Sequence, residues 1–254
     1  LNKNFNLMTD KLKTQQDKLL LNERHEAWEN VARKLAHEIK NPLTPIQLII
    51  DRLRSKFEKF LQDSKDKNDF NENLKTINKQ IKQIENLVNE FSDFARMPKP
   101  IFKKYNIFKL IKDNISLMNE LDTTVNIELN CKKNDVLISC DIEQLNRVFI
   151  NLLKNSIESI NDKYEKKPDF VKKIDIEITE KDDYIELYIT DNGLGFDTKN
   201  LKNIVKPYFK TKKNGTGLGL SIVNKVINDH NGTFKILPNN KGAKIYINLP
   251  KNVN

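Results

Sequence analysis

The chain has 254 residues, of which 31% are charged and only 7 are glycine, and its formal net charge is +9. This length is enough for two modest domains, and the composition suits a helix-rich soluble protein. No apolar run is long enough to span a bilayer, and no signal-peptide pattern is present. Because the chain begins with Leu1, we expect a piece of a longer protein, with any membrane contact through a segment absent from this chain.

The positive charge and the two cysteines exclude more than they indicate. The lysines are dispersed, and no helix-turn-helix or aromatic stacking pattern accompanies them, so we expect no nucleic-acid partner. Cys131 and Cys140 lack metal-ligand spacing and a neighbouring histidine. They are therefore expected to be reduced structural thiols.

Two apolar seams in the N-terminal part predict a helical hairpin. One seam covers residues 32–60 and the other residues 74–95, each with spacings that alternate between three and four. The polar, turn-prone segment 62–71 separates them. A single hairpin leaves its apolar seam uncovered, so we expect two copies to pair as a four-helix bundle, that is, a homodimer.

His37 stands in the first predicted helix, followed directly by Glu38 and, four residues on, by Asn41. Imidazole can act as a nucleophile near neutral pH, and an adjacent carboxylate can orient the ring and take its proton. His37 falls about 100° round the helix from the seam residue Ala36, so it points to the flank, with Asn41 one turn further on the same face.

A histidine on a helix is more often a solvated residue or one with its hydrogen bonds satisfied, and we interpret His25 and His230 as ordinary polar residues. Pro42 could kink the helix beside His37, or it could end one helix before another begins. The apolar seam continues in phase beyond Pro42, which favours one helix.

A proline-containing segment, residues 95–100, ends the second helix, and a mixed pattern follows. Helices are predicted over 107–121, 142–160 and 218–230. Strands are predicted over 125–130, 136–140, 174–179 and 185–190, with two more near the C-terminus. Helices packed on one side of these strands give an α+β sandwich, so the chain combines an α domain with an α+β domain.

The helix predicted over 142–160 carries Asn151 and Asn155 on one face, with Glu158 beside Asn155. Amide and carboxylate oxygens are hard ligands that suit Mg²⁺ and its waters, and Asn155 is the best candidate metal ligand. Taken alone, the motif could equally be the polar face of an amphipathic helix.

Asp191 ends a predicted strand and is followed by Gly193 and Gly195. A carboxylate at a strand end can accept a hydrogen bond from an exocyclic amine such as that of adenine. The glycines let the backbone turn and approach a flat base closely. Such a motif alone is often only a turn.

A glycine-rich segment opens the last predicted helix; its residues are Gly215, Thr216, Gly217, Leu218 and Gly219. Backbone N–H groups at a helix N-terminus attract phosphates. The segment is neither a Walker A loop nor a dinucleotide-binding fingerprint. Before it, Phe209 and Lys212 belong to a predicted lid whose lysines can meet phosphate oxygens.

Together, these motifs resemble the H, N, G1, F and G2 boxes of the sensor histidine kinases of two-component systems. The boxes correspond to His37 and to residues 151–158, 191–195, 207–209 and 215–219. Three stretches, 28–34, 37–47 and 91–98, are similar to the NtrY subgroup, and residues 5–12 resemble the second helix of a HAMP relay. The resemblance covers about residues 30–250.

The resemblance implies four parts: a HAMP-like end with a signalling helix (1–29), a dimeric phospho-acceptor domain (30–98), a linker (99–104) and an α/β-sandwich ATP-binding domain of the Bergerat type (105–254). It implies ATP and Mg²⁺ as cofactors and an NtrX-like response regulator as partner. It also implies that the chain is the cytoplasmic portion of a sensor anchored in the inner membrane.

The implied reaction is autophosphorylation of His37, followed by transfer to an aspartate of the regulator. Glu38 would deprotonate the imidazole, and Asn155, supported by Asn151 and Glu158, would hold Mg²⁺. Asp191 would select adenine, while Lys212 and the glycine-rich segment would stabilise charge on the phosphoryl group. The Glu38-x-x-Asn41 pattern also resembles the phosphatase motif of this family.

Two other functions stay open. One is an ATPase of the same fold that hydrolyses ATP without phosphotransfer, but Asn151 stands where such enzymes carry a catalytic glutamate. The other is a non-catalytic dimeric scaffold, against which the intact motif residues argue.

Overall fold

The computed structural model describes residues 31–32, 34–57, 64–95, 97–196, 204 and 217–252. The chain divides into two compact units, Leu1–Met97 and Pro98–Asn254. The segment expected at 1–29 lies outside the described residues, and the domain boundaries given above stay predictions. Among the described residues, no helix combines the length and the apolar character that crossing a membrane requires.

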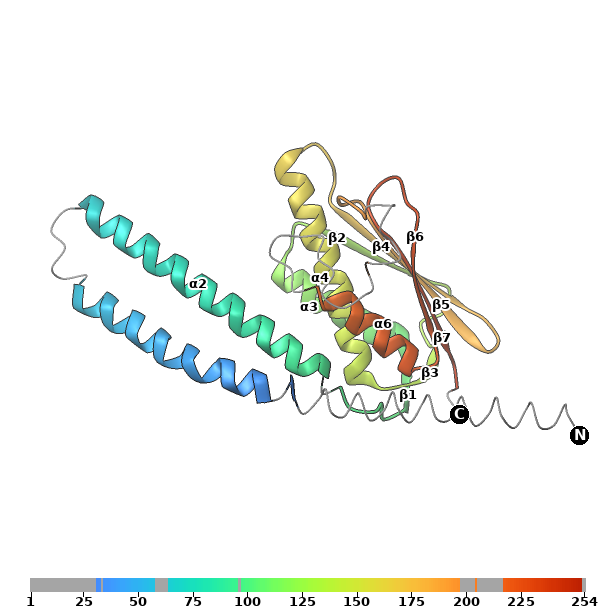
Figure 1. Cartoon of the computed structure of the whole chain (residues 1–254). Helices are drawn as coiled ribbons and strands as arrows, with labels where there is room; N and C mark the ends of the chain where they lie inside the picture. Colours follow the sequence, from blue (N-terminus) through green and yellow to red (C-terminus); the bar gives the residue numbers. More distant parts are fainter. Residues whose placement is uncertain are drawn as a thin grey trace, which may run out of the picture. The chain divides into compact units, whose positions relative to one another are not determined.

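The first unit is a hairpin of two antiparallel helices, residues 34–57 and α2 (Ser64–Ala95) (Figure 1). Helical backbone continues through Pro42 and Pro45, so the reading in which prolines separate two helices is wrong. Ile50, Leu74 and Ile81 form the buried contact between the helices. These three residues occupy seam positions, so the predicted seams do pair within one hairpin.

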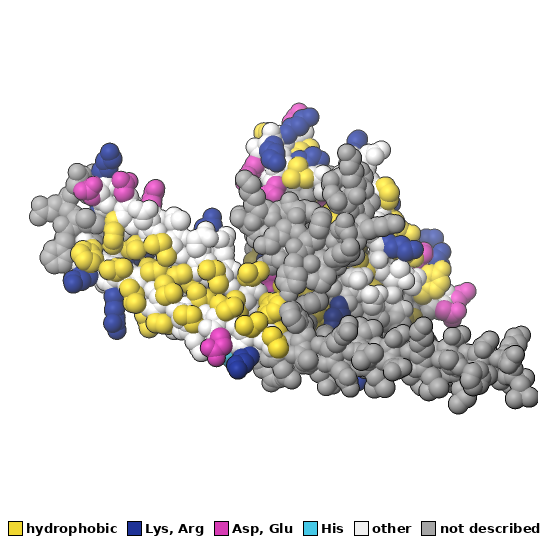
Figure 2. Space-filling view, in the orientation of Figure 1, with side chains coloured by type: hydrophobic (Ala, Val, Ile, Leu, Met, Phe, Trp, Pro, Cys, Tyr) yellow, Lys and Arg dark blue, Asp and Glu magenta, His cyan; other side chains and the backbone are white. Residues whose placement is uncertain are grey.

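Other residues of each seam are uncovered in the single chain. On the first helix Ile39, Ile46 and Leu53 are 40%, 43% and 38% exposed. On α2, Ile77 and Ile84 are 44% and 42% exposed. Figure 2 shows hydrophobic side chains gathered in a band along both helices. An apolar band of this kind marks an interaction surface, which is consistent with the predicted dimer.

The second unit is a five-stranded sheet with helices on one face (Figure 1). Its elements are β1 (Lys103–Asn106), α3 (Ile107–Leu121), β2 (Asn126–Cys131), β3 (Leu137–Cys140), α4 (Ile142–Lys166), β4 (Lys173–Glu180), β5 (Tyr184–Asp191), α6 (Gly219–Asp229), β6 (Thr233–Leu237) and β7 (Lys244–Pro250). The strand order is β2-β4-β5-β7-β6, with β2 parallel to β4 and the other pairs antiparallel. Strands β1 and β3 form a separate antiparallel pair.

Alternation along the strands builds the core of this unit. Ile185, Leu187 and Ile189 of β5 are buried, whereas the residues between them are only partly covered. The buried residues of α3, α4 and α6 pack on this apolar face, as the alternation predicts for a sheet covered on one side. The α+β sandwich predicted from the sequence is therefore confirmed.

Candidate functional site

His37 lies exposed on the first helix, while its neighbour Ala36 is buried, as the seam predicts. At about 100° per residue, Asn41 lies roughly 40° from the direction of His37, whereas Ile46 lies about 180° away. His37 and Asn41 therefore share a face opposite the apolar band. Glu38 and Asn41 are exposed as well, so all three candidate catalytic residues are accessible within the first unit.

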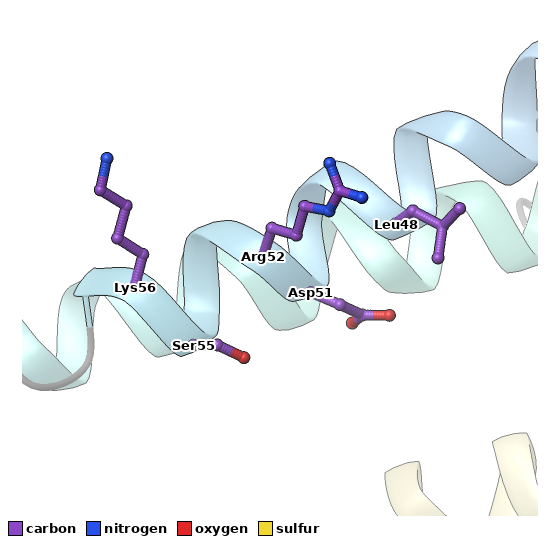
Figure 3. A pocket seen from close by; sticks show the side chains of 5 residues that line it. All are labelled: Leu48, Asp51, Arg52, Ser55 and Lys56. Carbon is purple, nitrogen blue, oxygen red and sulfur yellow. The ribbon is translucent and has the colours of Figure 1, made fainter.

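A shallow depression lies further along the same helix, lined by Leu48, Asp51, Arg52, Ser55 and Lys56 (Figure 3). Figure 3 shows Arg52 and Lys56 directed to one side of the helix and Asp51 and Ser55 to the other. Leu48, Asp51 and Ser55 fall within about 40° of the direction of His37. Leu48 is 55% exposed, so the face that carries His37 also presents a large apolar side chain among charges.

In the second unit, Asp191 is a buried carboxylate held by three donors. It ends β5 and is 4% exposed. Its Oδ1 accepts hydrogen bonds from the backbone N–H groups of Gly193, at 2.9 Å, and Ala243, at 3.1 Å. Its Oδ2 accepts a hydrogen bond from the Ser156 hydroxyl at 3.0 Å. Hydrogen bonds to a charged group of this kind offset the cost of burying it.

The glycines after Asp191 let the chain pass closely over α4. A Cβ on Gly193 would lie 2.5 Å from Ser159 Oγ and 2.8 Å from the Ser159 carbonyl carbon. The Leu194 N–H donates to the same Ser159 hydroxyl at 3.0 Å. Gly195 has a φ of 76°, which a side chain would disfavour. Glycine at both positions is thus a steric requirement of this approach.

Gly242 supports Asp191 from the other side, although the sequence analysis did not single it out. Its φ is 88°, and a Cβ there would lie 2.0 Å from the Asp191 carbonyl oxygen. The following residue, Ala243, supplies one of the N–H donors to the carboxylate. The available signal was a lone glycine in the polar turn between two strands, which by itself indicates only a turn.

The start of α6 lies against the asparagines of α4. A Cβ on Gly219 would lie 3.2 Å from Asn151 Oδ1 and 3.7 Å from Asn155 Nδ2. Asn151 Nδ2 donates to the Arg147 carbonyl at 2.8 Å. Two motifs that are far apart in the sequence are thus adjacent in the fold, and Asn151, Asn155 and Glu158 are all partly exposed there.

Of the remaining residues of the predicted site, the structure describes only some. Gly217 and Leu218 are described, with Leu218 buried and Gly217 at a φ of 74°. The predicted lid lies outside the described residues, as do Phe209, Lys212, Gly215 and Thr216.

The donor set on α4 fits a hard cation bound mainly through its substrate. Among the described residues, no group of three or more His, Cys, Asp or Glu could hold a metal. The side-chain amide of Asn155 lies next to the start of α6. An amide carries one oxygen that can bind Mg²⁺, which is commonly bound by few protein oxygens together with substrate phosphates and waters.

His230, expected to be an ordinary polar residue, is a buried histidine that is 1% exposed. Its Nε2 accepts a hydrogen bond from the Asp141 N–H at 3.0 Å, and its Nδ1 donates to the Val226 carbonyl at 2.8 Å. The Phe102 ring packs edge-on against the imidazole, with centroids 5.2 Å apart. Burial lowers the pKa of His230, so the neutral ring is favoured.

Asp141 and Gln144 at the start of α4 fix the segment that enters the second unit. The Ile101 N–H donates to Asp141 Oδ2 at 2.8 Å, while Asp141 Oδ1 caps α4 by accepting from the Gln144 N–H at 3.0 Å. Gln144 Nε2 donates to the Pro98 carbonyl at 2.8 Å. Residues 98–102, expected to form part of a linker, are therefore bound to the second unit itself.

Comparison with known proteins assigns a family to each unit. Residues 27–100 match the His Kinase A (phospho-acceptor) domain, and residues 140–253 match the histidine kinase-, DNA gyrase B-, and HSP90-like ATPase. An NtrY-like sensor histidine kinase of Rickettsia typhi is 38% identical over 244 residues, 96% of this chain and 39% of that protein. The chain thus carries both domains of a histidine kinase, and its relatives are NtrY-like.

Other histidine kinases are similar to this chain at lower sequence identity. The nitrogen regulation protein NtrY of Azorhizobium caulinodans is 34% identical over 242 residues, 91% of this chain and 30% of that protein. The solved catalytic domain of histidine kinase ThkA is 25% identical, with a TM-score of 0.53, and covers 60% of this chain and 97% of its own. ThkA in complex with the response regulator TrrA is 24% identical and has a TM-score of 0.63. The match covers 90% of this chain and 63% of the ThkA chain, and it supports a similar fold only. The chain spans less than two fifths of the length of the two curated relatives.

Proposed function

We propose that this chain phosphorylates its own His37 from ATP and passes the phosphoryl group to an aspartate of a response regulator. One observation carries the proposal: a phospho-acceptor match that contains an exposed histidine and an ATPase match that contains a braced, buried carboxylate occur in one chain. The ATPase match alone does not imply phosphotransfer, because the description of that family also names DNA gyrase B and HSP90. The phospho-acceptor match alone supplies an acceptor but no nucleotide site.

At the acceptor, Glu38 orients the His37 imidazole and removes its proton as a ring nitrogen bonds to the γ-phosphorus of ATP. The bond from that phosphorus to the β–γ bridging oxygen breaks, and ADP leaves. The exposure of both side chains supports this role, because the nucleotide must reach the ring. A neutral imidazole is a competent nucleophile, and an adjacent carboxylate raises its basicity in the transition state.

At the nucleotide, Asp191 accepts a hydrogen bond from the exocyclic amine of adenine. Asn155, with Asn151 and Glu158, would hold Mg²⁺, which when bound neutralises charge on the phosphates. The proximity of Gly219 to both asparagines supports a phosphate position at the start of α6. Lys212 and the segment 215–219, which lie outside or at the edge of the described residues, complete the cradle.

The partner is a response-regulator receiver domain, of NtrX-like type, that meets the face of the first helix carrying His37. The phosphoryl group must leave from this face, and Leu48 offers an exposed apolar contact about 16 Å along the helix from His37. ThkA has been solved with the response regulator protein TrrA.

Asn41 serves the dephosphorylation of the regulator by aligning a water molecule on its aspartyl phosphate. Anchoring of a longer cytoplasmic protein to the inner membrane completes this proposal.

Incubation of the full chain with γ-labelled ATP and Mg²⁺ tests the reaction. We expect acid-labile, base-stable phosphate on the chain, absent in His37→Gln, while His37→Gln binds ATP as tightly as the parent. His25→Gln is the control and should label normally. ATP hydrolysis without any phosphoprotein would instead establish the ATPase function, and label that persists on His37→Gln would contradict the assigned acceptor.

A further inference from the structure

Ser156 is a buried hydroxyl to which the proposed reaction gives no role. It directly follows Asn155 on α4 and is 3% exposed. Its Oγ lies 3.0 Å from Asp191 Oδ2. Asp191 Oδ1 accepts from two backbone N–H groups, so the carboxyl group is bound by three donors, and Ser156 is the one side chain among the contacts described for it.

The three hydrogen bonds divide the work between the two carboxylate oxygens. The N–H groups of Gly193 and Ala243 both donate to Oδ1, so rotation of the carboxylate about its Cβ–Cγ bond would lengthen these hydrogen bonds as well as the one to Oδ2. Only the Ser156 hydroxyl, within the part of the chain that the structure describes, meets Oδ2. Because both oxygens are held, the plane of the carboxylate is fixed, and the direction of its remaining lone pairs is fixed with it.

We propose that Ser156 is a positioning residue for base recognition, which holds Asp191 Oδ2 so that its free lone pair meets the exocyclic amine of adenine. This inference rests on the proposed ATP binding. It adds a residue whose effect depends on the chemistry of the base. Without the hydroxyl, Asp191 would still be present and still held at Oδ1, but Oδ2, the proposed acceptor, would lose its hydrogen bond and the carboxylate would be less firmly oriented.

The dependence on the base separates positioning from general support of the pocket. A purine nucleotide that lacks the 6-amino group has no hydrogen to offer Oδ2, so the orientation of the carboxylate contributes nothing to its binding. A purely structural role for Ser156 would affect both nucleotides equally, because both use the same phosphate and stacking contacts.

Calorimetric titration of the full chain with ATP and with purine riboside 5′-triphosphate tests this. In Ser156→Ala we expect ATP affinity to fall about tenfold and affinity for the analogue to change by less than about twofold, since a hydrogen bond to a charged group is worth roughly that factor. Ser116→Ala is the matched control, because Ser116 is also a helical serine, but it is exposed and its hydroxyl donates to the Lys112 carbonyl instead of to Asp191. Thermal unfolding without nucleotide reports whether either variant loses stability.

Each outcome has a distinct meaning. Selective loss of ATP affinity supports the positioning role, whereas an equal loss for both nucleotides, or no loss for either, overturns it. If the parent chain itself binds no ATP, the proposed function fails, and this result is read before any variant is compared.

Discussion

Glu38 and Asn41 flank His37 on the exposed face of the first helix but differ in chemistry. Asn41 has no acid–base capacity, so its amide can orient a water but cannot deprotonate the imidazole. We therefore expect Asn41→Ala to keep most autokinase activity and to slow loss of phosphate from the regulator by about tenfold or more, because the attacking water is no longer oriented. Glu38→Ala should impair autophosphorylation. Both rates are measured with labelled phosphate on purified chain and regulator. Equal loss of both activities in Asn41→Ala would mean that Asn41 only supports the helix near Pro42.

His230 makes stability depend on pH. Burial lowers its pKa in the folded chain, while the nearby carboxylates of Asp141 and Asp229 oppose that shift. The unfolded chain therefore binds more protons as pH falls below the ordinary value, about 6.5, and folding stability decreases with falling pH until the folded pKa is reached. We expect the Tm of the second unit to drop between about pH 7 and pH 5, and to drop less in His230→Gln. Parallel curves for the two proteins would contradict this assignment.

The residues that the sequence missed owe their roles to contacts that are distant along the chain. Asp191 could be predicted because a strand end places its carboxylate, and the adjacent glycines are local signals. Ser156, His230 and Gly242 carry no such signal. Ser156 meets a carboxylate 35 residues away, and His230 meets an amide 89 residues away. These partners are known only once the sheet and α4 are assembled.

Among the elements, apolar periodicity predicted most of the helices and strands but not their ends. The helix expected over 107–121 is α3 itself, with Asn106 as its N-cap. The helix expected to end at Ile160 continues to Lys166, because the polar residues after Ile160 favour helix without any apolar pattern. Strand β1 was not predicted, since two lysines begin it and its pairing with β3 supplies the order.

At the start of α4, one carboxylate oxygen of Asp141 caps the helix and the other holds the Ile101 N–H in the segment that precedes β1. Asp141→Asn keeps one acceptor oxygen, enough to cap α4 but not to hold the Ile101 N–H as well. We expect faster hydrogen exchange at the Ile101 amide in this variant with little change in stability. Asp141→Ala should lose the cap too and cost about 1 kcal/mol. Unchanged exchange at Ile101 in Asp141→Asn would show that this hydrogen bond does not hold the segment.

For the whole molecule, the first unit leaves several of its large apolar seam residues exposed, and a second copy of the chain can cover them. Ile46 and Ile84 are seam residues of the two helices, and each is more than two fifths exposed. We expect the full chain to be a dimer at micromolar concentration, and the double variant with Ile46→Lys and Ile84→Lys to be monomeric. A dimer of this variant would bury four unpaired ammonium groups, and each of them costs on the order of a few kcal/mol.

The matched control is Ile101→Lys, because Ile101 is 71% exposed and belongs to the second unit, outside the band. It should remain dimeric. Sedimentation velocity gives the mass of each variant, and circular dichroism shows whether the helices persist. A parent chain that sediments as a folded monomer, or a double lysine variant that still dimerises, would mean that the apolar band serves another contact. In that case the hairpin alone would have to present His37 to the nucleotide.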